Sequence, residues 1–260
     1  MKQAKYRFPS FRPASALAGI ACLIACLIVF GAASLPLRAD VDTSKPTPPI
    51  GWVQARVFHN LTLQDFKLQG VLHTGTTIIP LELRTKNKEM VYLFKQNPLQ
   101  IRVILDPASS TVERRQSSDA PWVPVTGHDL SQHILGTDIT YEDLGLNFIF
   151  WDHMIGVGTD SIKTLPAWCF EAYPSDPGSS AYAKVRYWIS SDYFAFLRVD
   201  GYNAQGQIVK RVEVNGVTQI GDAYVIKEME IATMLPDRDI SASRTYIEVH
   251  SGAPGSGLTE

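Results

Sequence analysis

Apolar and polar residues alternate along most of the chain after residue 51, which is the pattern of β-strands with one buried face. In QDFKLQGVLHTG, Phe66, Leu68 and Leu72 alternate with polar residues. TIIPLELRT and MVYLFKQ flank the polar turn KNKE and predict a hairpin, and PLQIRVILD with TVERRQ predicts a further pair. IKTLPAWCFEAYP is a further predicted strand.

The region after residue 180 has the most regular alternation. Five consecutive segments alternate, with short turn-prone connections: AYAKVRYWIS, SDYFAFLRVDGY, GQIVKRVEVN, AYVIKEMEIATML and SASRTYIEVHS. Asn215-Gly216 is the strongest tight-turn signal among the connections. Helical patterns are confined to residues 51–61 and 127–135. We therefore expect a mainly β protein with few short helices, in which a long antiparallel sheet curls and buries one face.

The first 39 residues differ from the rest. They contain five of the 24 Lys and Arg residues and no Asp or Glu, and residues 16–35 carry no charge. A basic start followed by an apolar run is typical of a secretory signal, but twenty apolar residues would also span a bilayer. LIAC, residues 23–26, is similar to a bacterial lipobox. A cleaved signal, a retained membrane anchor and a lipid anchor all remain open, and each places the body outside the cytoplasmic membrane.

Composition excludes several classes of function. Without residues 1–39 the chain has 19 basic and 26 acidic residues, a formal charge of −7, which disfavours nucleic-acid binding. Cys169 is then the single cysteine, so the sequence predicts no internal disulfide and no cysteine-based zinc site. Its apolar neighbours in LPAWCFEAY indicate a buried core thiol rather than a nucleophile.

Residues 136–145, GTDITYEDLG, gather three carboxylates: Asp138, Glu142 and Asp143. Their spacing is not that of a calcium loop, and the nearby histidines lack the spacing of a metal-binding helix, so no metal site is predicted. Carboxylates can serve glycoside hydrolysis, which stays as a less favoured alternative. Thr140 followed by Asp143 is typical of a capping box, with Tyr141 opening the first turn. The motif therefore predicts a short capped turn between strands.

Several strands are apolar on both faces, as in MVYLF and YFAFL. Either a cavity inside a curled sheet or the core of a β-sandwich would produce this pattern. The ordered motifs TDITYEDL, LPAW, YAKVRYWIS, LRVDGYNAQGQIVKRVEV and RTYIEV resemble the outer-membrane lipoprotein-sorting (LolA-like) family. The resemblance covers residues 60–250.

The resemblance implies an unclosed barrel of antiparallel strands around a hydrophobic cavity, with short helices as a lid. It also implies a periplasmic, non-enzymatic carrier or chaperone that transports lipid or lipoprotein acyl chains as a monomer and needs no cofactor. A sensor or adaptor of the same fold, acting on a membrane-protein partner, is the alternative. We expect a signal or anchor in 1–39, a Pro-rich linker in 40–50, the lipid-binding domain in 51–250 and a flexible tail in 251–260.

Alternation selects ten side chains as candidates for the lining of such a cavity. Because side chains have a period of two along a strand, an error of one residue would exchange the faces. The candidates are Phe66, Leu68, Leu72, Met90, Tyr92, Phe94, Ile101, Val103, Met229 and Ile231.

Overall fold

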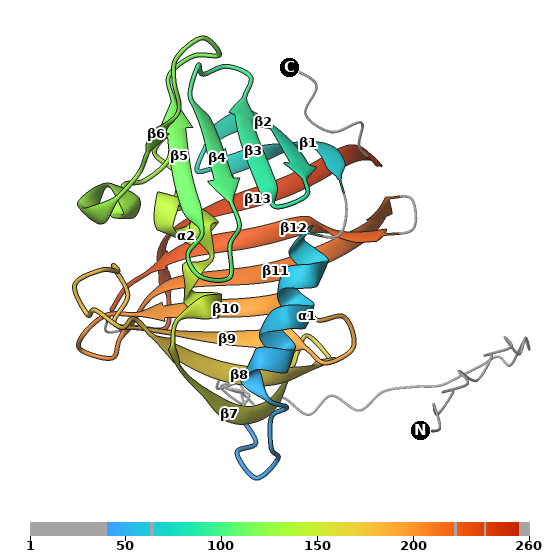
Figure 1. Ribbon diagram of the computed structural model, residues 1–260, viewed down its shortest axis with the longest axis vertical. Coiled ribbons are helices and arrows are strands. Elements are labelled where there is room, and N and C mark those ends of the chain that lie inside the picture. The colour runs from blue at the N-terminus through green and yellow to red at the C-terminus, as the bar shows by residue number, and fades with distance from the viewer. Residues whose placement is uncertain (1–40, 63–64, 221–222, 237, 255–260) are drawn as a thin grey trace, which may run out of the picture. The chain divides into compact units, whose positions relative to one another are not determined.

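The computed structural model describes residues 41–62, 65–220, 223–236 and 238–254. A single antiparallel sheet of 13 strands dominates it and confirms the mainly β prediction (Figure 1). The strands are β1 (Phe66–Thr74), β2 (Thr77–Lys86), β3 (Glu89–Phe94), β4 (Gln100–Ile104), β5 (Thr111–Arg115), β6 (Val123–Pro124), β7 (His153–Ile162), β8 (Leu165–Tyr173), β9 (Lys184–Ser190), β10 (Phe196–Tyr202), β11 (Ile208–Ile220), β12 (Ala223–Met234) and β13 (Ser241–Pro254). The helices are α1 (Ile50–Thr62), α2 (Tyr141–Gly145) and the 3-10 turns η1 (Gly127–Ser131) and η2 (Asn147–Phe150).

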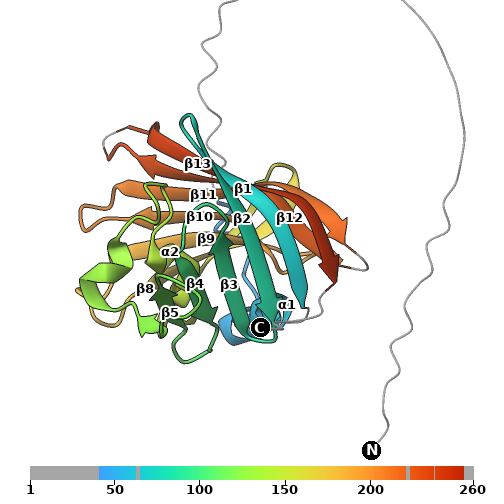
Figure 2. The same cartoon turned by 90° about the horizontal axis from the view of Figure 1, so that it is seen from above.

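The sheet consists of two meanders that are joined at one pair of strands. β1 to β6 form the first and β7 to β13 the second, and β1 pairs with β13 in a register that places Leu72 opposite Ile247. The order runs from β6 at one edge to β7 at the other, so the sheet is not closed into a barrel. Figure 2 shows how strongly it curls.

The inner face of the curl carries the main hydrophobic core. Leu72, Ile101 and Val103 are almost fully buried there, in one cluster with Ile231. α1 lies across the inner face of the lower strands in Figure 1, and its Val53 and Val57 pack in a second cluster with residues such as Phe170 and Tyr187 of β8 and β9. The short helices therefore cover the inner side of the sheet.

A third cluster lies on the outer face of β8 to β10. Cys169 is completely buried in it beside Trp188 and Leu197. Burial raises the pKa of the Cys169 thiol to about 12, which keeps it protonated and unreactive at neutral pH. The expectation of a buried core cysteine is confirmed. Strands β8 to β10 are thus buried on both faces, which explains why their sequences do not alternate cleanly.

The expected turn at Asn215-Gly216 is wrong. β11 continues through both residues to Ile220, and the register with β12 shifts around Gly216. The glycine forms a β-bulge in a long strand instead of a hairpin turn, because the pairing of β12 along the whole length of β11 overrides the local turn preference.

The strand β7 was not predicted from the sequence, because its glycines interrupt the alternation of apolar and polar residues.

The boundaries of the body differ slightly from those expected. Asp42 pairs with Thr159 of β7, so the expected linker is already attached to the edge of the sheet. β13 extends to Pro254, beyond the boundary expected at residue 250. The predicted leader in residues 1–39 lies outside the described residues. Across the described ranges, no helix is long and apolar enough to cross a membrane.

Candidate functional site

The helix α2 begins with the capping box predicted from the sequence. The Asp143 backbone N–H donates to the Thr140 hydroxyl at 3.2 Å, and the Thr140 N–H donates to the Asp143 carboxylate at 2.8 Å. α2 ends after one turn at Gly145. The prediction of a short capped turn is therefore confirmed, because the signal is local to four residues.

Asp138 is buried against the inner face of the sheet, where strand hydroxyl groups surround its carboxylate. It accepts from Thr233 at 2.6 Å, from Thr245 at 2.9 Å and from Ser243. Burial opposes ionisation of Asp138, but these hydrogen bonds and the nearby Lys210 outweigh it and lower the pKa of the carboxyl. This carboxylate therefore ties the loop before α2 to β12 and β13.

Asp143 has a second role besides capping. Its carboxylate accepts from the Tyr182 hydroxyl at 2.6 Å and forms a 3.1 Å ion pair with Lys210 of β11. The Lys210 ammonium also donates to the Asp138 carbonyl. Burial, followed by the adjacent Asp143, raises the pKa of Tyr182 well above its usual value, so the phenol remains a donor. Asp143, Tyr182 and Lys210 thus join α2, the loop before β9 and β11.

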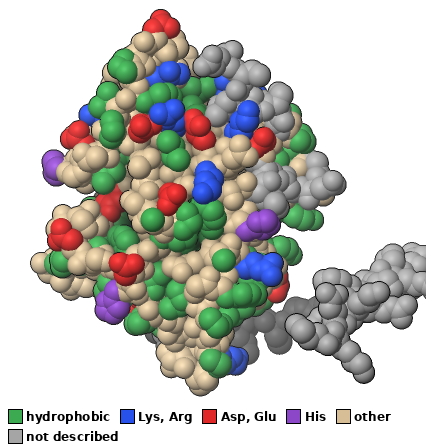
Figure 3. All heavy atoms as spheres, viewed as in Figure 1, with side chains coloured by type: hydrophobic (Ala, Val, Ile, Leu, Met, Phe, Trp, Pro, Cys, Tyr) green, Lys and Arg blue, Asp and Glu red, His purple; other side chains and the backbone are tan. Residues whose placement is uncertain are grey.

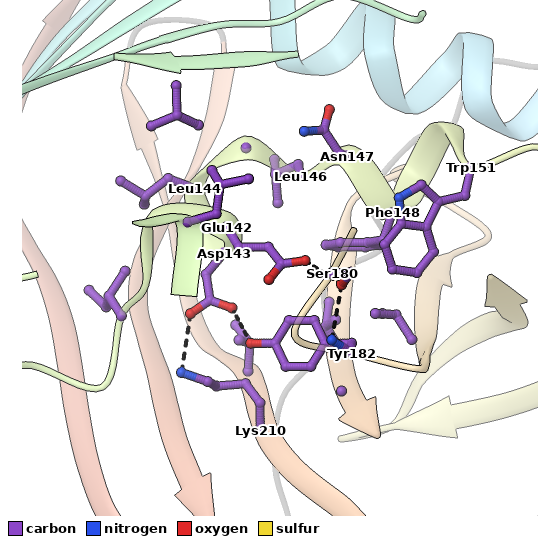
Figure 4. A pocket seen from close by; sticks show the side chains of 18 of the residues that line it. Glu142, Asp143, Leu144, Leu146, Asn147, Phe148, Trp151, Ser180, Tyr182 and Lys210 are labelled. Atoms are coloured by element: carbon purple, nitrogen blue, oxygen red, sulfur yellow. Dashed lines mark hydrogen bonds and ion pairs between the residues drawn. The ribbon is translucent and has the colours of Figure 1, made fainter. Parts of the chain in front are cut away.

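Glu142 points toward the loop before β9. Its carboxylate accepts from the Ser180 hydroxyl and from the Ala181 backbone N–H, the latter at 3.0 Å. Burial raises the pKa of Glu142, and neutral donors compensate this only partly. Figure 4 shows the three segments converging here, with Glu142, Asp143 and Lys210 beside Tyr182.

A cavity of about 360 Å³ lies next to this cluster, inside the curl of the sheet (Figure 4). Its volume is in the range of small-molecule sites. Most of its lining is aliphatic or aromatic, from α2, η2 and the inner face of β9 to β13, including Leu144, Leu146, Phe148, Val212, Met229 and Ile247. Figure 3 shows hydrophobic side chains gathered on the face that looks into the curl. The arrangement suits an apolar ligand.

Most of the ten cavity candidates lie on the inner face of the sheet, but only two of them line the cavity. Met229 and Ile231 line it. Leu72, Met90, Tyr92, Phe94, Ile101 and Val103 belong to the same hydrophobic cluster farther along the sheet. Burial raises the pKa of Tyr92 to about 12. Leu68 is buried beside Gly252, and Phe66 is half-buried. Their part in lipid binding stays a prediction.

Sequence reasoning missed Lys210, Tyr182 and Ser180. One signal was present, because Lys210 occupies an inner-facing position of an alternating strand, in phase with Val212. A lysine at such a position is buried only with a partner. No group of three His, Cys, Asp or Glu side chains in the described ranges could hold a metal ion.

A family model described as "-like: Uncharacterized protein" matches residues 121–259. No curated protein sequence matches the chain. Among solved structures, a DUF1329 family protein from Desulfovibrio piger is similar at 14% identity, over 82% of this chain and 96% of that one, with a TM-score of 0.65.

Two further structures match at the same level. A putative outer membrane lipoprotein-sorting protein domain from Vibrio parahaemolyticus has 14% identity and a TM-score of 0.66, over 81% of this chain and 94% of that one. A LolA superfamily protein from Nitrosomonas europaea has 14% identity and a TM-score of 0.59, over 81% and 95%. At this identity the likeness concerns the fold alone.

Proposed function

Because this chain belongs to the family matched over residues 121–259 and has the LolA-like fold, we propose that it is a non-enzymatic carrier of lipid or lipoprotein acyl chains in the bacterial envelope. The apolar cavity of about 360 Å³ between α2, η2 and the inner face of β9 to β13 is the observation that carries this proposal. Its lining could shelter an acyl chain.

The physical basis is the cost of exposing hydrocarbon to water. Each exposed CH₂ costs about 0.8 kcal/mol, so a carrier needs an apolar, covered cavity. Binding of this kind requires no catalytic group. The carboxylates beside the cavity are engaged in capping α2 and in holding the covering loops, which supports a binding role rather than hydrolysis.

The proposed place of action is the periplasm, reached through a signal or anchor in residues 1–39. Asp42 already pairs with the sheet edge, so removing the preceding segment would leave the carrier body intact. Mass spectrometry of the N-terminus of the native protein would distinguish a cleaved, a retained and a lipidated leader. An intact leader on protein recovered from the cytoplasm would contradict the proposed location.

Direct binding tests the carrier role. The fluorescent apolar probe N-phenyl-1-naphthylamine should bind the wild-type protein, and Met229→Trp should weaken binding by about tenfold because the indole fills the cavity. Mass spectrometry of protein purified from its native source should find co-purified acyl lipid.

Val217→Trp is the matched control, because Val217 is exposed on the distal part of β11 and does not line the cavity. It should bind the probe as the wild type does. Melting temperatures of both variants separate a blocked cavity from a damaged fold. Wild-type protein that binds no probe and carries no lipid would overturn the proposal.

A further inference from the structure

The charges that line the cavity are unbalanced. Two carboxylates, Glu142 and Asp143, face one cation, Lys210. Lys210 is 3.1 Å from Asp143 and its side chain is 8% exposed, so this pair is largely self-neutralising. Asp138, whose backbone carbonyl accepts from Lys210, adds a further negative charge. The partners of its carboxylate are hydroxyl groups of β12 and β13. The excess charge beside the cavity is therefore negative.

Of the two carboxylates that line the cavity, Glu142 is the one without an ion pair. The ion pairs of residues 41–62, 65–220, 223–236 and 238–254 do not include it, and its hydrogen bonds come from the Ser180 hydroxyl and the Ala181 N–H. These neutral dipoles hold the carboxylate in place but bring no positive charge into contact with it. The surrounding lining from Leu144, Phe148 and Met229 is apolar, which weakens screening by water.

A second negative charge brought into this cavity would be repelled. At an effective dielectric constant of about 20, two like charges about 6 Å apart repel each other about four times more strongly than they do in water. A ligand with a free carboxylate would meet this repulsion at Glu142, whereas an ester of the same chain would not. The apolar lining would be filled equally by both.

We infer that the cavity selects uncharged acyl lipids, such as acyl esters, and discriminates against fatty-acid anions through Glu142. This inference rests on the proposed carrier function and narrows its ligand to a chemical class. An ester-linked acyl chain is hidden from water with its head uncharged. A free fatty acid is ionised at neutral pH and binds more weakly, although its chain would fit.

The test is a competition with N-phenyl-1-naphthylamine, which is uncharged. Oleic acid and methyl oleate share one chain and differ in charge at pH 8, and both are used below their aggregation concentrations. Methyl oleate should displace the probe at a concentration about tenfold lower than oleate. Glu142→Gln should reduce this preference to about twofold, mainly by improving the binding of oleate.

Glu228→Gln is the matched control. Glu228 precedes the cavity residue Met229 on β12 and faces the opposite side of the sheet, where it accepts from Asn215. This variant should keep the wild-type preference. Equal binding of ester and anion by the wild type, or an unchanged preference in Glu142→Gln, would overturn the inference and leave the carrier function standing. If neither ligand displaces the probe and the probe itself fails to bind, the carrier function falls.

Discussion

The two faces of the sheet differ in how their carboxylates are partnered by cations. On the outer face, Glu171, Arg186, Asp200 and Arg211 lie in register across β8 to β11, and their signs alternate. Each carboxylate in this outer row forms ion pairs. The Arg186 guanidinium lies 2.5 Å from the Glu171 carboxylate, and the Arg211 guanidinium lies 2.9 Å from the Asp200 carboxylate. On the inner face, Lys210 forms an ion pair with Asp143 and donates to the backbone carbonyl of Asp138, whereas the ion pairs of the described residues do not include Glu142.

The pKa values of Glu171 on the outer face and Glu142 on the inner face shift in opposite directions. Burial opposes ionisation of Glu171, but hydrogen bonds from Tyr173, Lys184 and Arg186 outweigh it and lower its pKa from 4.5 to about 2. Burial raises the pKa of Glu142, because its donors are uncharged or backbone groups. A charged row with alternating signs stabilises the sheet, whereas uncompensated charge beside a cavity can shape ligand choice.

The largest expected effect comes from the inner face. Asp138→Ala should lower the free energy of unfolding by about 3 kcal/mol or more, because the hydroxyls of Thr233, Ser243 and Thr245 lose a buried acceptor. Urea denaturation measures this loss. Asp138→Asn keeps an acceptor oxygen and should cost clearly less. Wild-type stability in the alanine variant would show that the inner carboxylate does not anchor the loop.

The outer row should make the free energy of unfolding depend on pH. The pKa of Glu171 is lowered in the folded protein, so its stabilisation is present above the unfolded value near 4.5 and is lost as pH falls toward 2. This pKa shift corresponds to a contribution of at most about 3 kcal/mol to the free energy of unfolding. Glu171→Gln should therefore be less stable than the wild type at pH 7, and the difference should vanish near pH 2.

Urea unfolding at pH 7, 4, 3 and 2 checks this difference between the two proteins. Glu228→Gln, whose carboxyl lies outside the row, should track the wild type at every pH. A gap between Glu171→Gln and the wild type that stays constant down to pH 2 would rule out charge as the source of the stabilisation.

The smallest effect, with the opposite sign, is expected for Glu142→Gln. The raised pKa of Glu142 means that the folded protein loses stability as pH rises through that value, so the neutral amide removes a cost at pH 7. Stability should be unchanged or higher by less than about 1 kcal/mol. Thermal and urea unfolding measure it, and a loss as large as that of Glu171→Gln would abolish the contrast between the faces.

Local features of the sequence predicted much of the fold. The β2–β3 hairpin, the strands β9 to β13 and the capping box at Thr140 all follow from alternation, turn residues or hydrogen bonds within a few residues. Alternation also placed Leu72, Ile101 and Ile231 on the buried face. These signals need no knowledge of distant partners.

Features that depend on distant partners escaped prediction. Asn215-Gly216 has strong turn chemistry, yet the full-length pairing with β12 keeps it inside a strand. Most cavity candidates lie in the core beyond the cavity, because alternation defines a face but not where covering segments leave space. The position of that space is determined by how α2 and the loop before β9 pack against the sheet.

By itself, the sequence determined the strand content, the buried face of most strands and the capped turn at α2, because these depend on periodicity and contacts between near neighbours. The tertiary structure decided that β1 pairs with β13 and that Lys210 meets Asp143, residues 67 positions apart in the chain. Those contacts form only when the sheet curls, since curling brings the inner faces of distant strands together around one cavity.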